Sequence, residues 1–361
     1  MFELVDSKLI VTDSTDAFYM HYPDPPIGLV FLNYVEGTGK ITTANTMVPA
    51  SAWTAVFLCR YGTKAAITKA MQIADNLIDN IIETTVNDKA MYFQSVHYYN
   101  ATAGQWKRRK DDGYCEVYIR DLILSAYALT CVFMRCGKSQ YKEYALKLIE
   151  GIYKQQSAFS ALCGTDLPAY LDGAFPEFYL RNDVGESFYA VNWRVPLHLG
   201  DIAYDMSKLA ISVFGNRQET LEGEVFYIGD INDRYHSFVR NNCILNQRGI
   251  MQSTGLPYMY MAPVEGTSDF TGKNLSPVYN QWGDVNWTSD TVMWAVLGIA
   301  KNEGVGAKTF CDKVKSIMKD GFLYDVYTYE GQRDNEFIDI ATQATVFYLE
   351  AISIVYANGI Q

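Results

Sequence analysis

The sequence predicts a mainly helical fold, an α/α toroid of stacked helical hairpins with short β elements at the N-terminus and in long loops. Two observations predict it. Glycine follows an apolar helical segment at four places, where a left-handed residue ends one helix cheaply before the next begins. In each pair the first helix is apolar on nearly every side, and the second has one apolar and one polar face. Such pairs place the first helix inside a ring and the second outside.

The predicted hairpins follow one another along most of the chain. Their turns are centred on Gly62, Gly137, Gly215 and Gly304. The expected inner helices are 50–61, 117–136, 202–214 and 291–301. The expected outer helices are 64–83, 140–155, 217–239 and 307–319. A last apolar helix, 337–356, has no following partner, and closure of the ring against the first hairpin would bury it.

The remaining segments have the character of strands and long loops. Residues 1–45 are expected to form a β-rich arm packed on the main domain of 46–361, with short strands near 2–5 and 28–32. Residues 92–107 predict a β-hairpin. The segment 242–286 is rich in Gly, Pro, Asn and Tyr, and long ordered loops of this kind are often functional.

Composition and charge exclude several classes of protein. The net charge of −11, with a single basic cluster at 107–110, argues against nucleic acid as a partner. No apolar run is long enough to predict a membrane span. The N-terminus lacks the features of a secretory signal, so we expect a cytoplasmic protein or one exported without a cleaved signal, a virion location included. The seven cysteines and four histidines show no ligand spacing, so no metal or cofactor is expected.

Acidic and aromatic residues gather just before the predicted inner helices. They occur in the segments 111–116, 183–189, 281–287 and 333–336. If the inner helices are parallel, these segments meet at one mouth of the ring. A single acid at a helix start is ordinarily a cap or a complement to the helix dipole. Four such segments together favour a site.

Glycosidic cleavage needs one protonated and one ionised carboxyl group. Asp284, which lies between two tryptophans, is the first catalytic candidate, with Glu186 as its partner and Asp112 as the alternate. Aromatic walls would stack on the sugar rings and raise the pKa of one acid by desolvation. The expected substrate-binding residues are Trp282, Trp287, Trp193, Tyr189, Tyr114, Arg194 and His198.

These features resemble the six-hairpin glycosidase superfamily. The resemblance rests on the glycine-joined hairpins, on Asp-Gly-Tyr at 112–114 and on Trp-Gly-Asp-x-x-Trp at 282–287, and it extends over roughly residues 45–357. It implies an (α/α)6 barrel that acts on an oligo- or polysaccharide as a hydrolase, lyase or phosphorylase. The chain shows four hairpins and a lone helix, so the ring is incomplete unless further helices lie within 157–200 or 242–280.

Two other functions stay open beside a glycoside hydrolase. The first is a non-catalytic protein on the same scaffold, such as a virion or tail component or a glycan-recognition module, with the N-terminal arm and tyrosine-rich loops docking onto protein partners. The second is a polysaccharide lyase or epimerase that uses Arg194, His198 and Tyr189. Two carboxyl groups facing each other across an aromatic pocket would favour hydrolysis. An Arg/His/Tyr cluster without opposed acids would favour the lyase or epimerase.

Overall fold

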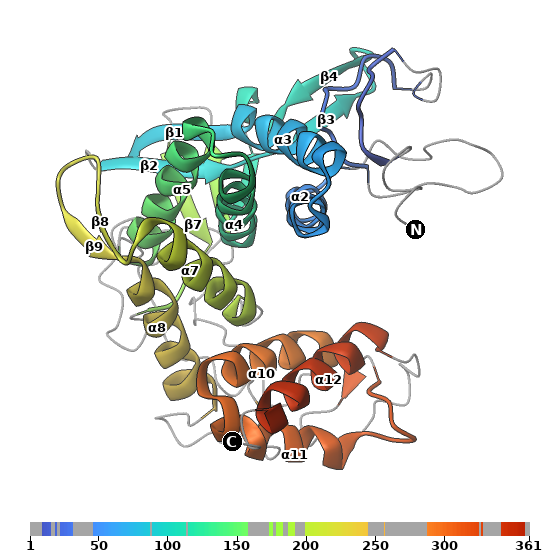
Figure 1. Ribbon diagram of the computed structural model, residues 1–361, viewed down its shortest axis with the longest axis vertical. Helices are drawn as coiled ribbons and strands as arrows, with labels where there is room; N and C mark the ends of the chain where they lie inside the picture. The colour runs from blue at the N-terminus through green and yellow to red at the C-terminus, as the bar shows by residue number, and fades with distance from the viewer. Residues whose placement is uncertain are drawn as a thin grey trace. The chain divides into compact units, whose positions relative to one another are not determined.

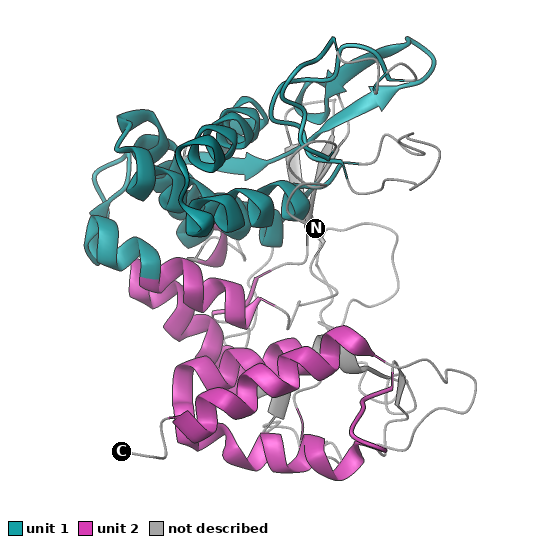
Figure 2. Ribbon diagram, turned by 45° about the vertical axis from the view of Figure 1, so that its right-hand side comes forward, with its two compact units in different colours: residues 1–154, 178–189, 209–226 teal, residues 155–177, 190–208, 227–361 magenta. Residues whose placement is uncertain are grey.

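The structure is a computed structural model of the 361-residue chain. It describes residues 9–15, 19, 22–31, 46–86, 89–112, 115–157, 173–175, 178–182, 187–191, 199–244, 256, 287–324, 326–327 and 341–357. Two compact units are present (Figure 2). Unit 1 comprises 1–154, 178–189 and 209–226, and unit 2 comprises 155–177, 190–208 and 227–361. The expected boundary after residue 45 stays a prediction.

The first predicted hairpin is confirmed in unit 1. Helix α2 (Val48–Tyr61) ends at Gly62, whose φ of 79° is the left-handed conformation that glycine adopts without a steric penalty. Helix α3 (Lys64–Asp79) follows at once, because the Thr63 hydroxyl caps it by accepting a hydrogen bond from the amide of Ala66. We expected α3 to continue to residue 83, but strand β1 (Ile81–Val86) begins two residues after α3 ends.

The second hairpin has the same construction. Helix α4 (Ile119–Cys136) ends at Gly137, with φ 68°, and helix α5 (Ser139–Ser157) begins two residues later. Buried residues occupy every side of α4 between Leu122 and Val132, as expected for an inner helix. On α5 the predicted apolar face is buried: Tyr141, Ala145, Leu148, Ile149 and Ile152.

Helices α2 and α4 pack against each other (Figure 1), and contacts near both ends show that they run in parallel. Val48 at the start of α2 lines the same cavity as Asp121 at the start of α4. Near the other ends, Cys59 and Cys131 are close enough for their thiols to interact. Burial chiefly, and Cys131 in part, raise the pKa of Cys59 to about 12. The predicted common direction of inner helices is therefore confirmed for this pair.

Short antiparallel strands fill the connections in unit 1. The hairpin expected within 92–107 is confirmed as β3 and β4, and β5, β6 and β7 form a three-stranded sheet in that order. The bounds are β1 (Ile81–Val86), β2 (Lys89–Gln94), β3 (His97–Asn100), β4 (Gln105–Arg108), β5 (Cys115–Tyr118), β6 (Phe178–Asn182) and β7 (Ser187–Val191). A 3-10 turn, Arg109–Asp111, follows β4. In the N-terminal segment, the expected strand near 28–32 is present as single bridges from Val30 to Ile10 and from Phe31 to Thr46.

The third predicted pair is partly wrong. Helix α7 (Gly200–Phe214) ends before Gly215 as expected, but the next helix does not start at residue 217. A β-hairpin, β8 (Arg217–Glu219) and β9 (Val225–Tyr227), comes first, and helix α8 (Ile228–Phe238) follows. Gly223, with φ 85°, makes the turn of this hairpin. The loop between the strands is also held by ion pairing at Glu222, a long-range contact that helical periodicity does not reveal.

Unit 2 contains the last predicted hairpin and the final helix. Helix α10 (Ser289–Glu303) leads through a 3-10 turn (Gly304–Ala307) into α11 (Lys308–Ile317), and α12 (Thr342–Ala357) packs on both. The short strands β10 (Trp287–Thr288) and β11 (Val326–Tyr327) pair beside α10, and a π-helix (Val239–Ile244) follows α8.

One inner helix departs from the expected pattern. Trp53, Phe57 and Tyr61 of α2 recur at four-residue steps, and they are 41%, 49% and 54% exposed. An apolar sequence on all sides therefore did not mean burial on all sides here. Separately, no helix among the described segments has the length and hydropathy that crossing a bilayer requires.

Gly28 should be among the least replaceable glycines of unit 1. Its φ is 79°, and a Cβ there would lie 2.0 Å from the Gln72 carbonyl oxygen of α3. Gly137 has φ 68° but no atom within 4 Å of its would-be Cβ. Gly137→Ala should therefore cost only the left-handed penalty of about 1–2 kcal/mol, and Gly28→Ala roughly 1–3 kcal/mol more from overpacking. Urea denaturation of both variants measures this, and equal losses would contradict the packing shown at Gly28.

Candidate functional site

A cavity of about 550 Å³ lies where α2 and α4 begin, within unit 1. We call it the helix-start pocket. It is lined by Thr46, Met47, Val48, Gln94, Ser95, Val96, Arg109, Tyr118, Arg120 and Asp121. Its size is within the range of small-molecule sites. The parallel packing of the two helices produces it, because both N-terminal ends open into the same space. The helix-start pocket lies at the starts of two expected inner helices, and the common mouth of all the inner helices stays a prediction.

Asp121 is the acid of the helix-start pocket. Its side chain is only 13% exposed, and its Oδ1 lies 3.3 Å from the Nε of Arg120. Burial raises the pKa of the Asp121 carboxyl to about 6, although the neighbouring guanidinium opposes the shift. A carboxyl group that changes protonation so near neutral pH suits proton transfer to or from a bound molecule.

Other polar groups of the helix-start pocket are available to a ligand. The buried Gln94 donates from Nε2 to the carbonyl oxygens of Leu77 and Ser95, and its Oε1 has no hydrogen-bond partner among the described residues. Arg109 stacks over the Tyr98 ring, with 4.1 Å from Cζ to the ring centroid. The lining thus offers two guanidinium groups and one acid, whereas the unpaired Gln94 Oε1 is itself buried. Such a set can bind hydroxyl groups and stabilise negative charge that develops on an oxygen.

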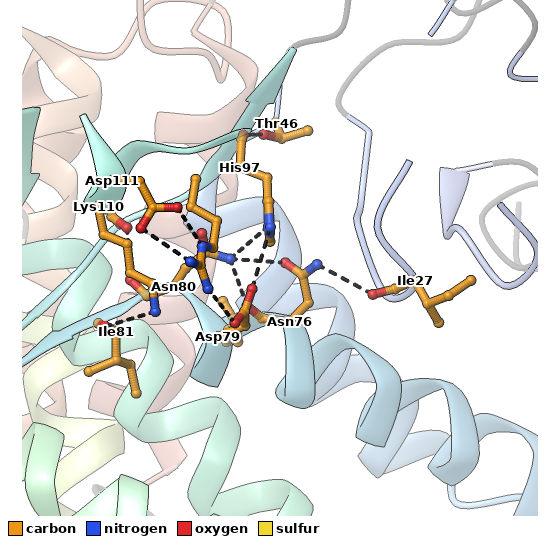
Figure 3. Close-up of polar contacts among 12 residues, drawn as sticks. Ile27, Thr46, Asn76, Asp79, Asn80, Ile81, His97, Lys110 and Asp111 are labelled. Carbon is orange, nitrogen blue, oxygen red and sulfur yellow. Dashed lines mark hydrogen bonds and ion pairs between the residues drawn. The ribbon is translucent and has the colours of Figure 1, made fainter. Parts of the chain in front are cut away.

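A second cavity, also of about 550 Å³, lies beside the β3–β4 hairpin in unit 1. We call it the hairpin pocket. Its lining includes Asp79, His97, Trp106, Arg108 and Asp111, several of which are joined by polar contacts (Figure 3). Its described lining residues also include Asp24, Pro26, Lys107 and Asp112.

Asp112 is the one predicted catalytic residue whose side chain the structure describes. It lies in the hairpin pocket rather than in the helix-start pocket. Its Oδ1 accepts a hydrogen bond of 3.0 Å from the Tyr98 hydroxyl, and its Oδ2 is 3.6 Å from Arg109. Its catalytic role stays a prediction.

The other predicted site residues are not brought together by the described part of the chain. Tyr189 lies in β7 and Trp287 in β10, where only the backbone is described. The remaining candidates lie outside the described residues: Asp284, Glu186, Trp282, Trp193, Tyr114, Arg194 and His198. Their roles stay predictions too.

Sequence reasoning missed Asp121 and its neighbours. The predicted acids all precede the inner helices, but Asp121 is the third residue of α4. One signal was present in the sequence. Arg120 and Asp121 are the sole charges between residues 117 and 134, in an otherwise apolar run. Charges in a helix buried on all sides are rare unless they are paired or have a function.

Comparison with solved structures finds the same fold along nearly the whole chain. An alpha-amylase from Clostridium perfringens matches with a TM-score of 0.53 at 12% identity, over 99% of this chain and 81% of its own. A sugar epimerase from a ruminal bacterium gives 0.51 at 12%, over 99% and 86%. The cellobiose 2-epimerase from Spirochaeta thermophila gives 0.53 at 12%, over 96% and 78%. No protein-family model and no curated protein sequence matches the chain.

These likenesses establish the fold class. The similar structures are α/α toroids. The prediction of a mainly helical α/α toroid is therefore confirmed. At 12% identity the likeness extends to the fold alone, and it assigns no reaction to this chain.

Proposed function

We propose that the protein is a saccharide-active enzyme of the epimerase or isomerase type, with its reaction at the helix-start pocket. The observation that supports this most is the environment of Asp121, a buried acid with a raised pKa that shares a cavity with Arg109 and Arg120. Two of the similar structures are named as epimerases of sugars, and the toroid fold is common to them and this chain.

Epimerisation next to a carbonyl needs a group that removes a proton from carbon and a positive environment for the resulting enolate oxygen. In this proposal Asp121 removes the proton from one face of that carbon, and Arg109 with Arg120 stabilises the negative enolate oxygen. A water molecule then returns a proton to the opposite face to give the epimer, and Asp121 releases its own proton to solvent. Within the described lining of the helix-start pocket, Asp121 is the single carboxylate. A two-carboxylate hydrolysis would need a second acid facing it.

The direct test is to follow proton exchange and bond cleavage in the same samples. Reducing mono- and disaccharides in deuterated water should gain deuterium at the carbon next to the carbonyl and yield an epimer, both seen by NMR. Polysaccharides in the same panel should show no new reducing ends. Absence of both reactions across the panel would refute the enzyme and favour the non-catalytic interaction protein.

The pH profile supplies an independent check. The pKa of Asp121 is raised to about 6, so a basic role predicts that kcat/KM rises as the pH increases through about 6. A general acid at the same position would give the opposite slope, because activity would fall as the proton is lost. A profile with no inflection near 6 would remove Asp121 from the reaction.

Glycoside hydrolysis is the second candidate. It is favoured by the amylase among the similar structures and by the acids predicted at Asp284 and Glu186. New reducing ends that disappear in Asp284→Asn and in Glu186→Gln would establish it in place of epimerisation. The polysaccharide panel described above distinguishes the two reactions.

A further inference from the structure

The hairpin pocket has the composition of a binding site, although the proposed reaction does not use it. Trp106 and Pro26 provide apolar surface, and charged side chains occupy much of the rest of the described lining. The indole Nε1 of Trp106 donates to the carbonyl oxygen of Tyr22, and the ring packs edge-on against Phe31 and Tyr99. The tryptophan is therefore held in a fixed position within the wall.

The polar groups of the hairpin pocket are also fixed in place. Arg108 reaches Asp111 through Nε at 2.7 Å and Nη2 at 3.2 Å, and it reaches Asp79 through Nη1 at 3.0 Å. The other oxygen of Asp79 lies 3.5 Å from Nε2 of His97 (Figure 3). Each of these carboxylates keeps lone pairs that its present partners do not use. Groups held in this way lose little entropy when a ligand binds.

His97 is a neutral member of this network. Its Nδ1 lies 2.7 Å from the Asn80 amide nitrogen, so Nδ1 accepts and Nε2 carries the proton that faces Asp79. Burial lowers the pKa of His97 to about 4, although Asp79 opposes the shift. Both ring nitrogens are engaged, so His97 orients Asp79 and is not free to act as a base.

The charge balance of the hairpin pocket selects the ligand. Four carboxylates and two cations are present among its described lining residues, with His97 neutral. An anion such as a phosphate or a uronate would meet a net negative surface. A neutral polyol suits the site better, because its hydroxyl groups can donate to the spare carboxylate lone pairs while a ring face lies on the indole.

We propose that the hairpin pocket is a binding site for an uncharged oligosaccharide, separate from the helix-start pocket. The proposal takes the chemical class of its ligand from the proposed function but does not require turnover. Adjacent residues line the two pockets: Val96 lines one and His97 the other, and Arg109 of the first lies 3.6 Å from Asp112 of the second. A saccharide held in the hairpin pocket would therefore lie close to the reaction site.

The experiment is a binding measurement on the full chain. An array of neutral di- to tetrasaccharides identifies a bound sugar, and calorimetry then compares the wild type with Asp111→Asn. Loss of a charged hydrogen-bond partner should weaken binding about tenfold or more. Asp312→Asn is the matched control, because the two acids have similar surroundings but Asp312 lies outside the lining of the hairpin pocket. Asp312 is 54% exposed and pairs with Lys308 at 2.6 Å, and Asp111 is 52% exposed and pairs with Arg108 at 2.7 Å.

Two further variants keep the test decisive if Asp111→Asn is poorly folded. Asp24→Asn changes an exposed residue of the lining and suits its φ of 54°, because asparagine tolerates the left-handed conformation. Trp106→Phe keeps an aromatic ring in the wall but shortens it. Both should weaken sugar binding. Asp24→Asn should leave thermal unfolding nearly unchanged, and Trp106→Phe should lower the unfolding temperature somewhat, because it loses the hydrogen bond to the Tyr22 carbonyl oxygen.

Three results would overturn the proposal. They are no binding of any neutral saccharide by the wild type, binding that survives all three lining variants, and binding of spermine at least as tight as that of the best sugar. Turnover separates this proposal from the proposed function. If the wild type binds sugar without turning it over and Asp111→Asn loses this binding, the result supports the hairpin pocket alone. If the wild type turns sugar over and Asp111→Asn binds sugar as the wild type does, the result supports the reaction alone.

Discussion

Asp121→Asn is expected to lower kcat by about 10²–10⁴-fold, the range lost when a positioned proton-transfer group is removed. Asparagine keeps the shape of the side chain but cannot exchange a proton. The control is Asp230→Asn, because Asp230 is an acid in the first turn of α8, as Asp121 is in α4, but lines neither pocket described here. Steady-state kinetics on the sugar identified by the NMR panel measure both variants.

The same substitution should not destabilise the fold at pH 8. The pKa of Asp121 is raised from 3.8 to about 6, so between those values the folded chain binds more protons than the unfolded chain. Stability therefore falls as the pH rises through this window, and above it the ionised acid disfavours folding. The neutral amide of the Asp121→Asn variant avoids that cost. Unchanged turnover in Asp121→Asn would refute a catalytic Asp121. So would a large loss of stability at pH 8 if each molecule that remains folded turns over at the wild-type rate.

Lys154→Met is expected to cost about 3–5 kcal/mol of stability, the range seen when one partner of a buried ion pair is removed. The Lys154 side chain is 3% exposed, and its Nζ lies 2.5 Å from Glu150 and 2.6 Å from Glu222. It also donates to the carbonyl oxygen of Ala90 at 2.9 Å. Methionine would fill the space but leave the buried Glu150 without a cation, with the Leu221 amide as its remaining hydrogen-bond donor.

Lys147→Met is the matched control on the same helix. Lys147 also pairs with two glutamates, Glu83 and Glu143, both at 3.3 Å, but those partners are 48% and 63% exposed. Solvent screens such pairs, so a loss of less than about 1 kcal/mol is expected. Guanidinium denaturation of the two variants gives the comparison. Similar losses would mean that the Lys154 contacts do not hold the β8–β9 hairpin to α5 and β2.

The helical hairpins were predictable because their signals are local. A glycine after an apolar helix ends it wherever it occurs, and this located the ends of α2 and α4 to the residue. The β8–β9 hairpin was not predictable, because its loop is held by Lys154, which is more than sixty residues away along the chain. Amphipathic periodicity cannot report such a contact.

The common direction of two inner helices was predictable, but the acid between their starts was not. Parallel inner helices opening at one end follow from the hairpin pattern, and α2 with α4 shows this arrangement. The acid in the helix-start pocket, Asp121, lies in the first turn of α4. A carboxylate in the first turn of a helix ordinarily complements the helix dipole. Its burial distinguishes it from the exposed Asp230 at the equivalent place in α8, and in the sequence only the apolar run around it indicated this difference.

A crystal structure of the Asp121→Asn variant with its sugar would show whether the starts of α2 and α4 form a saccharide reaction site. We expect a sugar in the helix-start pocket, with its carbonyl end within hydrogen-bond reach of residue 121 and an oxygen facing Arg109 or Arg120. A sugar bound only elsewhere, with this pocket holding solvent at saturating ligand, would contradict it.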